Sequence, residues 1–268
     1  MGNPWQHKIQ YKQDYLAIDT FKIGSGFEVT YHFEVSRDLD LKSFHKLDAV
    51  VERPELWNVY LNGELLKKSG EWWIDRQFYR FPIADKIKKG ENVITLQADK
   101  MSVHAEIMPV YVVGEFALKP LKQGFEISTG RLPKLGSWKD QGYPFYSQKV
   151  SYKQTFTVPK PNSDYLLRLN KWNGTLAEVK VNGKEAGIIA WEPYQLNIGS
   201  FLKEGRNDVT ITVVGSLKNT FGYFYTNNKS SINGPWTWNF APEKVPSIDQ
   251  YFLMDYGLFE PFNLIEVN

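Results

Sequence analysis

The sequence predicts an all-β protein built from two tandem antiparallel β-sandwich domains. Three observations support this fold class. Helical periodicity is almost absent, apolar and polar residues alternate with the period of a strand, and segments of the first half recur in the second half. With 268 residues, the chain is long enough for two domains that each bury a core of their own.

The recurring segments keep the same order at nearly constant spacing. They are 59–63 (VYLNG) and 179–183 (VKVNG), 89–96 (KGENVITL) and 204–211 (EGRNDVTI), and 33–35 (FEV) and 156–158 (FTV). The offsets are 120 (179 − 59), 115 (205 − 90) and 123 (156 − 33) residues, which agree to within a loop insertion. We interpret this pattern as a duplicated domain.

Alternation along the chain predicts the individual strands. Val29, Tyr31, Phe33 and Val35 fall on one face of a strand, as do alternate residues of 209–213 in the second half. Asn62-Gly63 and Asn182-Gly183 separate apolar runs, and Asn-Gly pairs favour the positive φ angles of type I′ hairpins. Further turns are predicted at 89–92 and 204–207, each preceded by one short helical turn, at 83–88 and 198–203.

The predicted domains are residues 1–120 and 121–268. Residues 110–118 read as the last strand of the first domain, and a Gly- and Pro-rich boundary region follows from Lys119 to Lys149. The second domain ends in a tail, from Asn219 onward, that is dense in aromatic residues and too often interrupted by Gly and Pro for a helix.

Composition narrows the possible functions. A formal charge of +2, with scattered Lys and Arg, gives no electrostatic support for a nucleic-acid partner. The absence of cysteine excludes disulfides, thiol nucleophiles and zinc–thiolate sites, and no apolar run is long enough to span a membrane. Aromatic residues make up 15% of the chain, and we expect most of them to pack in the cores of the sandwiches.

The second half contains a characteristic series of motifs. VKVNGKEAG at 179–187 is followed by WEPYQLNI at 191–198 and by LKEGRN at 202–207. This order of a strand, an Asn-Gly turn, a Pro-Tyr strand and a Gly-x-Asn turn resembles the galactose-binding-like jelly roll of glycoside hydrolase family 2 and rhamnosidase-like bacterial enzymes. The first half resembles a more diverged copy. Segments 110–116, 141–146 and 255–262 are also similar to C-terminal regions of large rhamnosidase-like hydrolases.

The resemblance implies an accessory region rather than a catalytic domain. Enzymes of this kind keep catalysis in a separate barrel, and the alternating strand–helix pattern of a barrel is missing here. We therefore expect this chain alone not to be an enzyme, and we carry over no catalytic residues. The implied partners are a weakly bound carbohydrate and the catalytic domain of a parent enzyme, with no nucleic acid and no membrane. The resemblance also suggests an extracellular or periplasmic location.

Catalytic and metal sites have little support in the sequence. The acids that could form a glycosidase pair are Asp140, Glu192, Asp249, Asp255 and Glu260, and we interpret them as surface or turn acids. His7, His32, His45 and His104 lack metal-ligand spacing, and no phosphate-binding or calcium-binding loop is present. We predict no catalytic residue, no metal site and no cofactor.

Sugar binding is the remaining site hypothesis. An aromatic ring can cover the apolar face of a pyranose while amide and carboxylate groups bind its hydroxyls. The predicted carbohydrate-binding residues are Trp172, Asn173, Trp191, Glu192, Trp236 and Trp238. Core packing, or an interface with a catalytic domain, is the alternative for these tryptophans. We expect the Tyr194 ring to point into the sandwich, as in the Pro-Tyr strand of the resembled domains.

The same alternatives, sugar contact or packing in a core or interface, apply in the first half to Trp57, Trp72 and Trp73. If Trp72 and Trp73 lie on a strand, one ring points outward and the other inward.

Two other function classes also stay open. One is a purely structural or protein-interaction module whose aromatic tail docks on a neighbouring domain. The other is a small β-sandwich glycosidase or lyase, which would need two acids facing each other across a groove.

Overall fold

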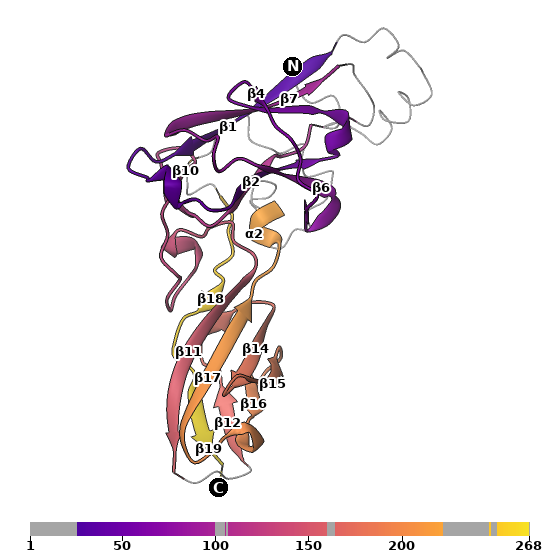
Figure 1. The fold of residues 1–268 in the computed structure, drawn as a ribbon. Helices are drawn as coiled ribbons and strands as arrows, with labels where there is room; N and C mark the ends of the chain where they lie inside the picture. The colour runs from indigo at the N-terminus through magenta and orange to yellow at the C-terminus, as the bar shows by residue number, and fades with distance from the viewer. Residues whose placement is uncertain are drawn as a thin grey trace. The chain divides into compact units, whose positions relative to one another are not determined.

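The computed structural model describes residues 26–99, 105, 107–159, 164–221, 247 and 251–267, and within this part of the chain nearly every element is a strand (Figure 1). The chain divides into two compact units. The first contains the described residues up to Gly130, with Ser247, and the second contains the described residues from Arg131 to Phe221 and from Tyr251 onward. Each unit is a β-sandwich, so the all-β prediction is confirmed.

The first unit packs a six-stranded sheet against a four-stranded sheet. The order of the six-stranded sheet is β4 (Glu64–Leu65), β3 (Asn58–Leu61), β7 (Gly90–Ala98), β1 (Phe27–Val35), β10 (Phe125–Ser128) and β9 (Ala117–Pro120). The order of the four-stranded sheet is β5 (Trp72–Trp73), β6 (Asp75–Pro82), β2 (Leu47–Glu52) and β8 (Tyr111–Gly114). Alternate residues of both sheets, such as Leu96 and Ala49, meet in one hydrophobic core.

The second unit has the same central strand order. One sheet runs β11 (Lys149–Val158), β17 (Gly205–Val214), β14 (Leu176–Val181) and β15 (Lys184–Ile189), and its long strands lie side by side in Figure 1. The facing sheet runs β16 (Gln195–Asn197), β12 (Tyr165–Arg168) and β19 (Asn263–Glu266), and a third pair joins β13 (Trp172–Asn173) to β18 (Gly257–Leu258). In the first unit, β1-β7-β3-β4 corresponds to β11-β17-β14-β15, and β6-β2-β8 corresponds to β16-β12-β19.

Helical structure among the described residues is limited to single turns. They are the 3-10 turns η3 (Leu41–Ser43), η4 (Pro54–Leu56), η5 (Lys139–Gln141) and η6 (Gly199–Phe201), and the four-residue helix α2 (Lys218–Phe221). η6 lies in the predicted helical turn at 198–203. In the predicted turn at 83–88, the amide of Ile87 donates to the Ile83 carbonyl at 3.1 Å. No described helix has the length and apolar character needed to cross a membrane.

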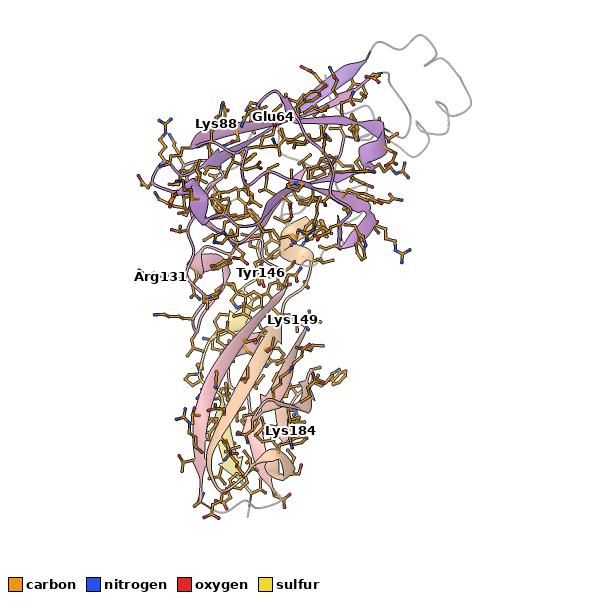
Figure 2. All side chains as sticks on the ribbon, in the orientation of Figure 1. Glu64, Lys88, Arg131, Tyr146, Lys149 and Lys184 are labelled. Carbon is orange, nitrogen blue, oxygen red and sulfur yellow. The ribbon has the colours of Figure 1, made fainter. Side chains whose placement is uncertain are left out.

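Both Asn-Gly hairpins form as predicted. Asn62 and Gly63 have φ angles of 51° and 87°, and Asn182 and Gly183 have 50° and 82°. These pairs of positive φ angles fit a type I′ turn, and each turn joins strands through a two-residue loop. Lys184 follows the second turn at the start of β15, and Lys149 begins β11, with its Nζ 2.5 Å from Glu178 Oε1 (Figure 2).

The region around residue 120 differs from the sequence prediction. The single strand expected at 110–118 is divided into β8 and β9, because the chain crosses there from the four-stranded to the six-stranded sheet. β10 then lies inside the predicted boundary region and pairs with β9, so the expected division at 120/121 falls between two paired strands. β10 also runs parallel to β1, which is an exception to the antiparallel pattern.

Candidate functional site

Three loops of the second unit meet at one end of the sheet β16-β12-β19. Arg168, the last residue of β12, pairs with Gln195 at the start of β16 and with Asn263 at the start of β19. Both pairings are antiparallel, so loops 169–171, 190–194 and 259–262 emerge at the same end of the sheet. We call this region the loop end of the second unit.

Trp191 and Glu192 lie on a tight turn at this loop end. The Tyr194 amide donates to the Trp191 carbonyl at 2.9 Å, and the Leu169 amide donates to the Tyr194 carbonyl at 3.1 Å. The peptide bond between Glu192 and Pro193 is cis. The Trp191 side chain is 77% exposed and Glu192 is also exposed. A large, exposed indole is therefore presented on a backbone that hydrogen bonds hold in place.

On the core side of this turn, the ring of Tyr194 packs against the ring of Trp172. Their rings meet edge to face, with centroids 5.4 Å apart and planes at 88°, and both pack against the hydrophobic core. The inward direction expected for Tyr194 is confirmed. Trp172 is half-buried, and its Nε1 is buried without a hydrogen-bond partner among the described residues. The structure thus places Trp172 under the exposed surface, while Trp191 lies on it.

Asn173 is committed to a structural contact. Its Nδ2 donates to the Asp255 carbonyl at 2.7 Å, and its backbone pairs with Gly257 across β13 and β18. This contact fixes the segment that returns to the second unit at Asp255–Leu258. Of the other predicted residues, Trp236 and Trp238 lie outside the described residues.

The loop end also gathers polar residues that the sequence did not assign to sugar binding. With the Gln195 amide turned so that its oxygen faces Arg168, that oxygen accepts from Nε at 2.6 Å and from Nη2 at 2.5 Å. Asn170 Nδ2 donates to the Pro261 carbonyl at 3.3 Å, and the Phe259 amide donates to the Lys171 carbonyl at 2.9 Å. Lys171 and Glu260 are exposed beside them. Strand pairing brings the three loops to one end of the sheet, since the loops are far apart in sequence.

The loop end presents both an apolar ring and polar groups to solvent. The exposed indole can cover an apolar surface, and the charged and amide groups around it can exchange hydrogen bonds with hydroxyls. Of the five acids considered as a glycosidase pair, Asp140, Glu192, Asp255 and Glu260 are exposed, and Asp249 lies outside the described residues. Within the described part of the chain, no group of three or more His, Asp or Glu residues could hold a metal ion.

In sequence, the chain matches part of a curated protein. No protein-family model matches the chain. An alignment 117 residues long, which covers 41% of the chain, is 27% identical to part of a protein from Formosa agariphila that is named "Putative beta-glucuronidase". The match covers 10% of that protein. The chain thus spans about a tenth of the curated relative that it matches.

Several solved structures are similar to the chain. A rhamnosidase from Novosphingobium sp. PP1Y is 20% identical, with a TM-score of 0.35, over 90% of this chain and 22% of the enzyme. An alpha-L-rhamnosidase from Streptomyces avermitilis is 12% identical, with a TM-score of 0.31, over 72% of this chain and 22% of the enzyme. A beta-D-mannosidase from Dictyoglomus thermophilum is 12% identical, with a TM-score of 0.27, over 76% of this chain and 26% of the enzyme.

Proposed function

We propose that this chain is a non-catalytic, carbohydrate-binding region of a glycoside-degrading enzyme. In this role it binds a pyranose at the loop end of the second unit and supports the catalytic domain or extends its substrate groove. The observation that carries the proposal is Trp191, an indole 77% exposed on a turn that backbone hydrogen bonds hold at Leu169 and Tyr194. The sequence match to part of a protein named as a glycosidase supports the same reading.

The chemistry of the loop end fits a sugar ring. One face of a pyranose presents C–H groups, which the Trp191 indole can remove from water. The hydroxyls at the ring edge need donors and acceptors, and Glu192, Lys171 and Glu260 are exposed around the same three loops. We expect weak affinity, because an exposed surface desolvates few atoms and replaces hydrogen bonds that water already makes.

We also infer that the two units are diverged copies of one β-sandwich. The equal strand order of β4-β3-β7-β1 and β15-β14-β17-β11 supports this inference. The register supports it further: Phe33 pairs with Asn92 and Phe156 pairs with Asn207, which are corresponding positions in the repeated segments.

Binding to a defined panel of oligosaccharides tests the proposed function. The panel contains oligosaccharides that end in β-glucuronic acid, α-L-rhamnose, β-D-mannose or β-D-galactose, and binding to the full chain is measured by calorimetry. We expect Trp191→Ala to weaken binding at least tenfold, because burying an aromatic side chain contributes roughly 1.5–3 kcal/mol. Trp191→Phe should retain part of the affinity.

Ile188→Ala is the matched control, because Ile188 is 52% exposed on the neighbouring strand β15. It should leave binding unchanged. If the full chain binds none of the oligosaccharides of the panel, the carbohydrate-binding proposal is overturned. Equal affinity of Trp191→Ala and the unaltered chain would remove Trp191 from the site.

The non-catalytic part of the proposal needs its own test. The chain alone should not hydrolyse 4-nitrophenyl glycosides of the four panel sugars. If it does, Glu192→Gln and Glu260→Gln decide whether acids of the loop end are responsible. Loss of turnover in either variant would replace the accessory role with a small β-sandwich glycosidase, in which the two acids would act as a pair.

A further inference from the structure

The first unit presents an exposed tryptophan at the position that corresponds to Trp191. β2, β6 and β8 of the first unit have the order of β12, β16 and β19 in the second. The carboxyl end of β2 and the amino ends of β6 and β8 therefore lie together, as at the loop end of the second unit. Trp72 precedes the start of β6 by three residues, Trp191 precedes that of β16 by four, and Trp72 is 50% exposed.

Hydrogen bonds fix the backbone of Trp72. In the β5–β6 pair, Trp72 lies opposite Tyr79. The Arg80 guanidinium donates from Nε to the Trp72 carbonyl at 3.4 Å and from Nη1 to Asp48 Oδ2 at 3.0 Å. The side chains of Arg80 and Asp48 are only 19% and 6% exposed. Because its carbonyl is bonded to a largely buried ion pair, the backbone of Trp72 is fixed before any ligand arrives, and only the side chain has to be ordered on binding.

The chain around Trp72 also carries charged groups that suit hydroxyls. Lys68 Nζ lies 4.7 Å from the centroid of the Tyr79 ring, which is opposite Trp72. Glu71 is the neighbour of Trp72 in the chain, and its side chain is 63% exposed while it bonds Lys46 at 3.2 Å. An exposed ring with a cation and a carboxylate close to it in the chain offers the two kinds of surface that a pyranose needs.

We propose that Trp72 forms a second pyranose-binding surface, so that each unit of the chain carries one sugar contact. This inference rests on the proposed function and extends it to the class of ligand. Two weak contacts on one chain favour a polymeric glycan over a single sugar. Once one unit is bound, the other meets neighbouring sugars of the same polymer at a raised effective concentration.

Trp72→Ala, Trp191→Ala and the double variant test this proposal with the same four oligosaccharides. For the oligosaccharide that binds, the unaltered chain should show two binding sites, each single variant one, and the double variant none. Trp72→Phe should retain part of the lost binding. Leu65→Ala is the control in the first unit, because Leu65 is 56% exposed and lies outside the proposed surface. On the matching immobilised polysaccharide, each single variant should lose at least tenfold in apparent affinity.

A residue-level measurement covers the case in which an alanine variant folds poorly. N-bromosuccinimide oxidises exposed indoles, and mass spectrometry locates the oxidised residues in the unaltered chain. The bound oligosaccharide should protect both Trp72 and Trp191. If the oligosaccharide protects Trp191 alone, and calorimetry finds one binding site that Trp72→Ala does not change, the proposal of a second binding surface is overturned. The proposed function would then stay intact. Binding of none of the four sugars would instead overturn the proposed function.

Discussion

Two buried asparagines repeat one hydrogen-bond network in the two units. Asn92 and Asn207 are both 0% exposed. Asn207 Oδ1 accepts from the Lys203 amide at 2.9 Å and from Asn182 Nδ2 at 2.8 Å, and its Nδ2 donates to the carbonyls of Lys203 and Gly205 at 2.7 and 2.9 Å. Asn92 makes the same four contacts with the corresponding residues at 2.7–3.0 Å. Each amide thus joins its Gly-x-Asn turn to its Asn-Gly hairpin.

Asn207→Asp tests this network at the residue scale. The substitution keeps the shape and the acceptor, but it removes two donors and leaves a charge facing two carbonyls. We expect a loss of about 3 kcal/mol in the free energy of unfolding at pH 7, measured with urea. Below about pH 4 part of the loss should return, because the protonated carboxyl regains one donor.

Asn58→Asp is the matched control, because Asn58 is exposed and its side-chain amide donates a long hydrogen bond of 3.4 Å to Asp99, also at the surface. It should change the free energy of unfolding by less than about 0.5 kcal/mol. Equal stability of the two variants would show that the network contributes nothing specific.

A second prediction at the residue scale concerns acid stability. Hydrogen bonds from Lys153 and Thr155, at 2.7 and 2.9 Å, lower the pKa of Asp208 below its ordinary value. A lowered folded-state pKa adds stability above the unfolded-state pKa, about 3.9, and this stability is lost as the pH falls through the folded-state pKa. Lys153→Met should therefore reduce stability at pH 7, and its difference from the unaltered chain should shrink below about pH 4.

Urea titrations at several pH values measure this difference. Lys180→Met is the control, because its partner Glu185 is 84% exposed and lies 3.4 Å away, so little stability depends on the pair. A difference for Lys153→Met that stays constant, or grows, on acidification would contradict the role of Asp208.

At the scale of elements, the returning segment around β18 completes the second core. The Trp138 amide donates to the Tyr256 carbonyl at 2.9 Å, and the Gly136 amide donates to the Leu258 carbonyl at 2.8 Å. The Trp138 side chain is 1% exposed, and its Nε1 donates to the Tyr152 hydroxyl at 2.7 Å. Tyr256 and Leu258 are buried in the same cluster. The segment thus supplies core residues that the strands up to β17 leave missing.

Gly257→Ala should displace this segment. Gly257 has a φ of 146°, which side chains rarely adopt, and an added Cβ would lie 2.3 Å from the Gly136 carbonyl oxygen. We expect a loss of more than about 2 kcal/mol in the free energy of unfolding. Gly183→Ala is the control: its φ is also positive, at 82°, but an added Cβ meets no atom within 4 Å, so only the backbone strain of about 1 kcal/mol applies. Equal losses would mean that close approach at Gly257 is unimportant.

At the scale of the whole molecule, the two hydrophobic cores share no residue. The first draws its buried residues from 35–127 and the second from 138–262. We therefore predict two transitions in thermal unfolding, one for each unit. Asn92→Asp should lower one transition and Asn207→Asp the other, which calorimetry can follow. If each variant lowered both transitions together, the units would unfold as one cooperative structure.

The sequence alone determined the features that depend on local backbone chemistry. Alternation predicted strands, as in β1 and β17, because the period of a strand is two residues. Asn-Gly predicted both type I′ hairpins, because these residues tolerate positive φ. The order of repeated segments predicted two sandwiches, since the same turns and strands in the same order favour the same pairing.

Only the tertiary structure decided which residues share a surface. The loops of Trp191 and Glu260 emerge at the same end of the sheet as Arg168 because β12 pairs with both β16 and β19, and no local pattern encodes that pairing. The structure also decides that Trp191 is exposed while Trp172 is half-buried against the core, which the sequence did not distinguish. It also decides the place of β10, whose parallel pairing with β1 joins residues about 90 positions apart (126 − 34). Burial and non-local pairing arise when distant segments pack, so they become visible only in the folded chain.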